Sequence, residues 1–204
     1  MDKEYARITR GLAEFLLLSL LALIPSLVTY IDLAIVGNRI GEVSVTEITQ
    51  EAFLLATALT FAYGARRFPD RRGFFVLMAG FFGCALLREL DNFLDVVWHG
   101  FWVWPVSALA LGAVGYVAIR CRDSVVGPMA RFIGTRSYYF MLFGLVVLLV
   151  FSRTFGSGRL LWKSLMGEAY VSAFNTVVQE GIELLGYICI VYGSVALWFR
   201  RFDG

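Results

Sequence analysis

The chain has 204 residues, of which 59% are hydrophobic and only 17% charged, and its formal net charge at pH 7 is +2. That leaves too little polar surface for a water-soluble globule, and several separate apolar runs approach the roughly 20 residues that cross a bilayer. With no basic run interleaved with aromatic residues, nucleic acid is excluded as a partner. The composition indicates an all-α, polytopic integral membrane protein.

We expect a bundle of six transmembrane helices in a single membrane domain, at residues 12–36, 48–64, 73–98, 105–119, 137–155 and 171–199. Pro25 lies within the first span, where neighbouring helices can tolerate a kink. A basic turn around Pro69 ends the second span. An aromatic turn at residues 100–105 follows the third span and has the character of a membrane interface.

Basic residues are distributed unevenly between the two ends of these spans. With the N-terminus inside, the outer connections hold only Arg39, Arg159 and Lys163. The inner segments hold thirteen basic residues: Lys3, Arg7, Arg10, Arg66, Arg67, Arg71, Arg72, Arg120, Arg122, Arg131, Arg136, Arg200 and Arg201. The positive-inside rule therefore predicts a multi-pass protein of the cell inner (plasma) membrane with both termini cytoplasmic.

The outer end of the third predicted span carries an unusual polar stripe. At 100° per residue, Arg88, Asn92, Asp95 and His99 share one face of a continuous helix, and Asp91 flanks it. Charged side chains at membrane depth are costly and usually mark function. The stripe is therefore the first candidate site.

Counting 1.5 Å per residue from the inner ends places charged residues of several spans at a similar height, roughly 21 to 28 Å up. Together, this layer and the polar stripe contain six acids and two arginines. The acids are Glu51, Glu89, Asp91, Asp95, Glu180 and Glu183, and the arginines are Arg88 and Arg153. Six acids against two arginines leave an excess of negative charge, which needs protonation, water or a bound cation. In the last span, Thr176, Glu180, Glu183 and Tyr187 repeat the steps of the stripe.

A weak internal repeat accompanies this layer. The spacing from Gln50-Glu51 to Tyr63-Gly64 equals that from Gln179-Glu180 to Tyr192-Gly193. The flanking sequences are also similar, with residues 41–42 matching 167–168 and residues 66–68 matching 200–202. The pattern predicts a parallel duplication of helices 1–2 and 5–6, which would pair Glu51 with Glu180.

One functional hypothesis is a cation site that is open to the outer face. Asp95 and His99 stand one helical turn apart and would bind a divalent metal ion together with Glu180 or Glu183. His99, Asp95 and Glu89 would then activate water against a lipid-like substrate. Arg88 and Arg153 would steer an anionic head group.

Other readings stay open. The carboxylates would load and release ions in a small proton- or cation-coupled transporter. In a scaffold or sensor without turnover, the polar layer would recognise another membrane protein or a ligand. In a purely structural reading, ion pairs and hydrogen bonds would hold the bundle together, through Arg88, Arg153, Glu51, Asp91, Asn92 and Tyr187. His99 alone would be an interfacial imidazole. We expect membrane lipids and a lipid-like or small cationic ligand as partners, no haem and no nucleotide, and we leave a homo-oligomer open.

Overall fold

A computed structural model describes residues 2–37 and 44–199, and every regular element among them is helical. The long α-helices are α1 (Asp2–Tyr30), α2 (Val45–Arg67), α3 (Arg72–Glu89), α5 (Val103–Arg120), α7 (Arg136–Val146) and α10 (Ser172–Phe199). The short α-helices are α4 (Asp91–Leu94), α6 (Val126–Ile133), α8 (Ser152–Phe155) and α9 (Lys163–Met166). The π-helical segments are η1 (Ile31–Val36), η4 (Val147–Phe151) and η5 (Gly158–Trp162), and the 3₁₀ turns are η2 (Pro69–Arg71), η3 (Arg122–Ser124) and η6 (Gly167–Ala169).

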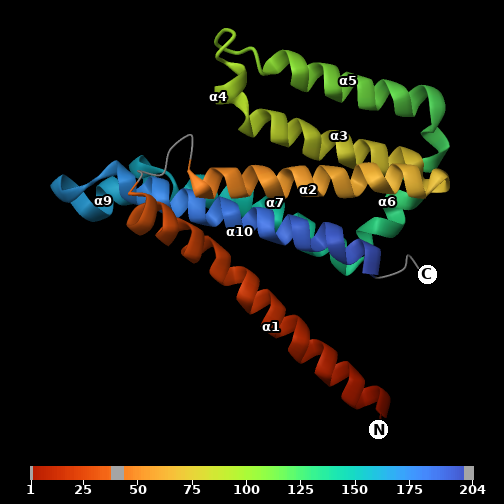
Figure 1. The fold of residues 1–204 in the computed structure, drawn as a ribbon, viewed down its shortest axis with the longest axis horizontal. Helices are drawn as coiled ribbons and strands as arrows, with labels where there is room; N and C mark the ends of the chain where they lie inside the picture. Colours follow the sequence, from red (N-terminus) through yellow and green to blue (C-terminus); the bar gives the residue numbers. More distant parts are fainter. Residues whose placement is uncertain (1, 38–43, 200–204) are drawn as a thin grey trace.

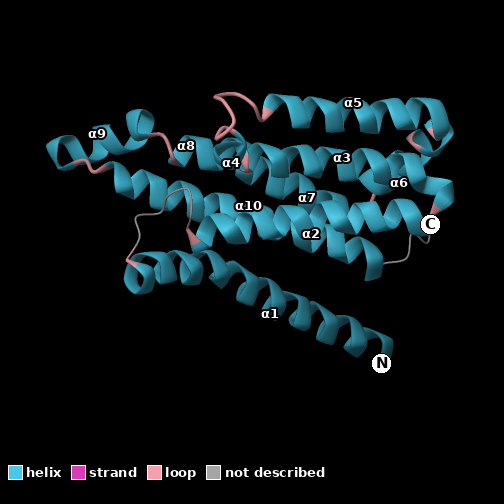
Figure 2. Ribbon diagram, turned by 45° about the horizontal axis from the view of Figure 1, so that its top comes forward, coloured by secondary structure: helices cyan, strands magenta, loops and turns pink. Residues whose placement is uncertain are grey.

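The helices pack side by side in the order α5, α3, α2, α10 and α7, so that α2 lies in the middle, between α3 and α10. α1 contacts α10 through its C-terminal half and through Glu14, whose carboxylate accepts from the Tyr192 hydroxyl at 2.9 Å, and its first turns diverge from the bundle (Figures 1 and 2). The start of α1, the α2–α3 turn and the end of α10 lie toward the same end of the bundle (Figure 1).

Four helices of the described chain are long and apolar enough to cross a membrane: Glu4–Val36, Val103–Arg120, Arg136–Phe155 and Ser172–Trp198. The other two predicted spans correspond to α2 and α3, which carry charged residues near both ends. Their place inside a membrane stays a prediction. Some residues used in the sequence analysis lie outside the described residues. They are three arginines counted for the positive-inside rule (Arg39, Arg200 and Arg201) and the predicted repeat flanks at 41–42 and 200–202.

The third predicted span is too long at its outer end, because α3 ends at Glu89 and not at Trp98. Leu90 leaves the helical conformation (φ −81°, ψ 14°), and the ion pair of Arg88 with Asp91 spans the break. Farther on, the Asp95 carboxylate accepts the N–H of Gly100 at 3.0 Å, and Gly100 has φ +85°, a left-handed conformation that glycine adopts readily. The predicted polar stripe is therefore divided between the end of α3, the short helix α4 and a series of turns.

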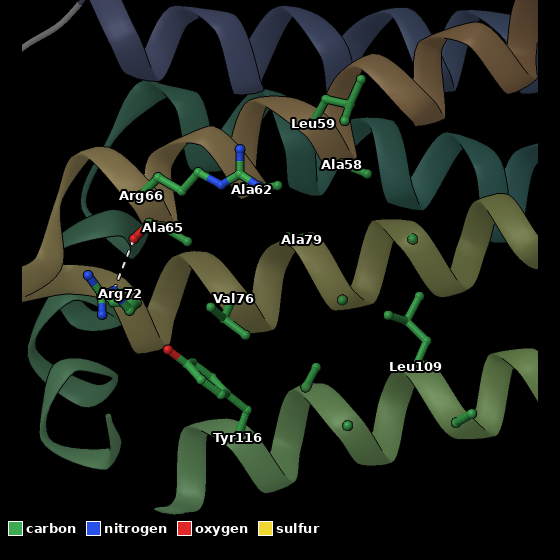
Figure 3. A pocket seen from close by; sticks show the side chains of 15 residues that line it. Ala58, Leu59, Ala62, Ala65, Arg66, Arg72, Val76, Ala79, Leu109 and Tyr116 are labelled. Atoms are coloured by element: carbon green, nitrogen blue, oxygen red, sulfur yellow. Dashed lines mark hydrogen bonds between the residues drawn. The ribbon is translucent and has the colours of Figure 1, made fainter. Parts of the chain in front are cut away.

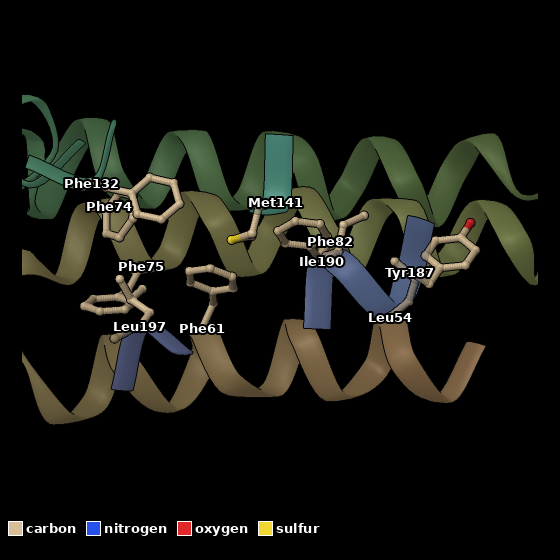
Figure 4. Close-up of a cluster of buried hydrophobic side chains, with 11 residues drawn as sticks. Leu54, Phe61, Phe74, Phe75, Phe82, Phe132, Met141, Tyr187, Ile190 and Leu197 are labelled. Atoms are coloured by element: carbon tan, nitrogen blue, oxygen red, sulfur yellow. The ribbon is translucent and has the colours of Figure 1, made fainter. Parts of the chain in front are cut away.

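Aromatic side chains fill the middle of the bundle (Figure 4). The rings of Phe61 and Phe82 stack with centroids 5.7 Å apart, and Phe74 and Phe75 pack beside Phe61. Tyr187 lies at one end of this core, and its hydroxyl points away from the other rings (Figure 4). The core therefore gives way to polar groups at that end.

A buried carboxylate joins the end of the first helix to the start of the second. Asp32, in η1, is 0% exposed and accepts hydrogen bonds from the N–H groups of Val45 (2.8 Å) and Thr46 (2.9 Å) and from the Thr46 hydroxyl (2.5 Å). These N–H groups belong to the first turn of α2, where they have no partner within the helix. Asp32 thus fixes α2 relative to α1.

Candidate functional site

Three glutamates gather where the aromatic core ends, and we call Glu89, Glu180 and Glu183 the carboxylate cluster. Glu89 is the last residue of α3, and the other two lie on successive turns of α10. Glu183 is only 6% exposed, and the other two are half-buried. Glu89 and Glu180 each interact electrostatically with Glu183, and Glu180 also with Glu89. The three acids therefore share one site between two helices.

Each acid of the cluster accepts a hydrogen bond from a neutral side chain. The Tyr187 hydroxyl donates to Glu89 Oε1 at 2.9 Å, and Gln179 Nε2 donates to Glu183 Oε1 at 3.0 Å. Gln50, from α2, donates to Glu180 Oε2 at 3.0 Å and to the Glu180 carbonyl at 3.2 Å. These donors orient the carboxylates but do not neutralise their charge.

The two arginines of the predicted layer take different places. Arg153 is among the electrostatic partners of Glu89 and Glu180. Arg88 also influences Glu89, but its guanidinium is paired with Asp91 and lies over the Trp102 ring, 5.3 Å from the ring centroid. Among the described residues, Arg153 is therefore the main cationic neighbour of the cluster that is not already paired with another acid.

Asp95 and His99 lie together, but in the turns that follow α4. His99 Nδ1 is 3.3 Å from Asp95 Oδ2, and the imidazole is fully exposed. The charged side chains with the largest electrostatic influence on Glu89 are Glu183, Arg88 and Arg153, and those with the largest influence on Glu180 are Glu183, Glu89 and Arg153. Within residues 2–37 and 44–199, no three His, Cys, Asp or Glu side chains stand in an arrangement that could hold a metal ion. The geometry thus gives no support to a shared ligand set of Asp95, His99, Glu180 and Glu183.

The α2 residue that contacts the cluster is Gln50 and not Glu51. Gln50 is 2% exposed, whereas Glu51 is half-buried on the neighbouring face. The helical periodicity of α2 could have predicted that Gln50 is buried, because Gln50 shares one face of the helix with Leu54, Thr57 and Phe61, at steps of 4, 3 and 4. Of the remaining predicted site residues, Asn92 is exposed in α4.

Gln179 is a second contributor that the sequence analysis did not single out as a site residue. Its side chain lies against Gly156, where an added Cβ would meet the Gln179 amide. Asn175, one turn earlier on α10, donates to the Gly156 carbonyl at 2.9 Å and accepts from the Tyr170 hydroxyl at 2.7 Å. The glycine therefore lets the end of the α8 helix approach α10 and hold Gln179 in place.

Neutralising one acid of the cluster is expected to stabilise the protein. Glu180→Gln keeps an oxygen that accepts from Gln50 and removes one of three like charges, so the free energy of unfolding at low ionic strength should rise by about 1 kcal/mol. Thermal unfolding of the purified protein in detergent measures this change. Glu51→Gln, on the next face of α2, is the control and should leave the unfolding temperature unchanged. A lower unfolding temperature for Glu180→Gln would contradict the repulsion argument.

Fold and site together define a class: an all-helical protein with four helices able to cross a membrane and a carboxylate cluster at one end of its described bundle. No protein-family model, curated protein or solved structure matches this chain.

Proposed function

We propose that this protein is a multi-pass membrane protein whose carboxylate cluster binds a small cationic ligand from the outer face. The observation that carries the proposal is the charge balance of the cluster. Three carboxylates have Arg153 as their main unpaired cationic neighbour, and their hydrogen-bond donors Gln50, Gln179 and Tyr187 are neutral. With all three carboxylates ionised, two negative charges stay uncompensated, and partly buried charges of one sign favour a bound counter-ion.

The geometry favours a cation held by charge and hydrogen bonds over a chelated metal ion. Chelation of a divalent ion needs several ligands converging on one point, and no such group occurs among the described acids and histidines. A small organic ammonium ion needs only an anionic, partly desolvated surface. The divalent ion predicted from the sequence is retained as a competing ligand in the experiment below.

We infer that α2 and α3 also lie within the membrane, giving six spans. Both helices pack between α5 and α10, which are themselves able to cross a membrane, so all four occupy the same layer. The arginine-rich end, with Arg66, Arg67, Arg71 and Arg72 at the α2–α3 turn, then faces the cytoplasm of a cell inner membrane. The cluster lies at the opposite end of α2 and α3, toward the outer face.

We do not extend the proposal to hydrolysis or to transport. Asp95 and His99, the predicted general base and its partner, belong to the turns that follow α4 and not to the cluster. Below the cluster, the space between α2, α3 and α10 is filled by Phe61, Phe82 and other apolar side chains. Because this packing gives no polar path from the cluster through the rest of the described bundle, the cluster is proposed as a binding site that a ligand reaches from one side only.

The proposal predicts a cation-dependent stability that disappears with the cluster. Purified protein in a neutral detergent should unfold at a higher temperature in tetramethylammonium chloride or magnesium chloride than in sodium chloride of equal ionic strength, because a ligand of the folded state stabilises it. The variant Glu89→Gln/Glu180→Gln/Glu183→Gln should show no such difference between the salts. The salt that gives the larger shift separates an organic cation from a divalent metal.

A variant with the same loss of charge is the control for this measurement. Glu51→Gln/Asp70→Asn/Glu168→Gln removes three carboxylates that lie outside the cluster, two of them exposed. It should keep the difference between the salts. Equal responses of the two triple variants, or no response of the unaltered protein to either cation, would overturn the proposed site.

A further inference from the structure

A groove runs between α2, α3 and α5 near the arginine-rich end of the bundle (Figure 3). Its volume is about 660 Å³, within the range of about 300–1,000 Å³ typical of ligand pockets. Small and aliphatic side chains line most of it, among them Ala58, Ala62, Gly83, Ala108 and Gly112. At Gly80 an added Cβ would stand 2.8 Å from that of Ala113, so α3 and α5 are in close contact where they line the groove.

One end of the groove is basic. Arg66 and Arg72 lie there with Tyr116, whereas Leu109 lies farther along the apolar part (Figure 3). Arg72 Nε donates to the Ala65 carbonyl at 3.2 Å, which fixes the guanidinium and leaves its terminal nitrogens for another acceptor. None of the ion pairs between described side chains uses Arg66 or Arg72. The groove therefore combines an apolar channel with two arginines at its mouth.

This combination of an apolar channel and two arginines fits a membrane phospholipid better than it fits a second copy of the chain. A phospholipid has an apolar chain attached to a phosphate, and a guanidinium is well suited to phosphate. A second copy seated about a two-fold axis along the membrane normal would place Arg66 and Arg72 opposite the same residues of its partner, and like charges repel. Charge complementarity thus selects an anionic lipid.

We propose that the α2–α3–α5 groove binds an anionic phospholipid, with an acyl chain along the apolar channel and the phosphate between Arg66 and Arg72. This site is at the opposite end of α2 and α3 from the carboxylate cluster, and it does not depend on the cation-binding proposal. Tyr116, 43% exposed, completes the polar mouth with a hydroxyl donor.

Native mass spectrometry of the detergent-purified chain tests the lipid site. One phosphatidylglycerol should bind to the unaltered chain in preference to phosphatidylcholine of the same acyl length. Arg66→Gln/Arg72→Gln should weaken phosphatidylglycerol binding by about 30-fold, since each basic residue near an anionic lipid contributes about a fivefold change. Arg67→Gln/Arg71→Gln removes the same charge beside the groove and should retain the binding. Equal losses in both pairs, or equal affinity for the two lipids, would overturn the proposal.

Filling the channel provides a second test that leaves the arginines intact. Gly112 lines the groove and Gly115 does not, and an added Cβ meets nothing within 4 Å at either glycine, so both leucine variants should fold. Gly112→Leu should abolish the bound lipid, and Gly115→Leu should retain it. If Gly112→Leu instead converted a dimer into a monomer without changing lipid binding, the groove would be an interface between copies and the lipid site would be refuted.

Discussion

Asp32→Ala is expected to lower the free energy of unfolding by about 3 kcal/mol, the largest effect of any single substitution considered for this chain. The carboxylate is completely buried and satisfies two backbone N–H groups of the first turn of α2 and the Thr46 hydroxyl. Its removal leaves those donors buried without an acceptor, and it removes a negative charge from a helix N-terminus, where such a charge is favourable. Thermal or denaturant unfolding in detergent measures the loss.

Two further variants separate this role of Asp32 from a general effect of removing an acid. Thr46→Val deletes only the hydroxyl bond and should cost about 1 kcal/mol. Asp70→Ala removes an exposed carboxylate that pairs with Arg71 on the surface and should have almost no effect. If Asp32→Ala were no worse than Thr46→Val, the backbone N–H groups of α2 would have found other acceptors and the cross-helix cap would carry little energy.

The Asp32 contact also bears on the site. Thr46 and Gln50 are one turn apart on the same buried face of α2, so the residue that anchors α2 and the residue that binds Glu180 are coupled. We therefore expect Asp32→Ala to weaken the cation-dependent stabilisation as well as the fold. Thr46→Val, which keeps the backbone contacts, should preserve it.

Long apolar runs made most helix positions predictable. The predicted spans 105–119 and 171–199 correspond closely to α5 (Val103–Arg120) and α10 (Ser172–Phe199). The helix that includes α7 begins directly after Thr135, whose hydroxyl accepts the N–H of Tyr138 in an N-cap contact. These features are local in sequence, and the structure agrees with them.

The end of α3 was not predictable by the same reasoning. Arg88 and Asp91 are three residues apart, a spacing that also stabilises a continuous helix, so their ion pair gives no sign of the break at Leu90. The turn that replaces the helix depends on Gly100 and on the Asp95 carboxylate that binds its N–H. The sequence analysis placed Asp95 and His99 on one face of a continuous helix, but α3 ends before it reaches either residue.

Charge was the wrong guide to the contact between α2 and the cluster. Glu51 was selected because it is an acid at the expected height, whereas burial is decided by helical phase, which places Gln50 and not Glu51 toward α10. The contact between Asp32 and Thr46 joins residues 14 positions apart in the sequence and has no local signature. The meeting of Glu89 with Glu180 and Glu183 follows from the height argument, but only the packing of α3 on α2 and α2 on α10 brings these side chains together.

Gly186→Val is expected to destabilise the protein by about 2 to 3 kcal/mol, because α7 and α10 are in backbone contact there. An added Cβ at Gly186 would stand 2.9 Å from the Gly144 carbonyl oxygen and 3.2 Å from the Leu148 nitrogen, and neither backbone atom can rotate away. The reciprocal change, Gly144→Val, would press its Cβ to 2.6 Å from the Gly186 carbonyl oxygen. Unfolding in detergent should show similar losses for both variants.

Gly181→Val, on the same helix, is the matched control, because an added Cβ there meets nothing within 4 Å. It should leave the unfolding free energy nearly unchanged. Since the two clashes occur at one contact, the double variant of Gly144 and Gly186 should lose less than the sum of the single losses, because the helices separate only once. Gly186 directly precedes Tyr187, so a displaced α10 should also break the hydrogen bond to Glu89 and remove the cation response. Additive losses, or an unchanged response to cations, would show that the close approach of α7 and α10 does not position the cluster.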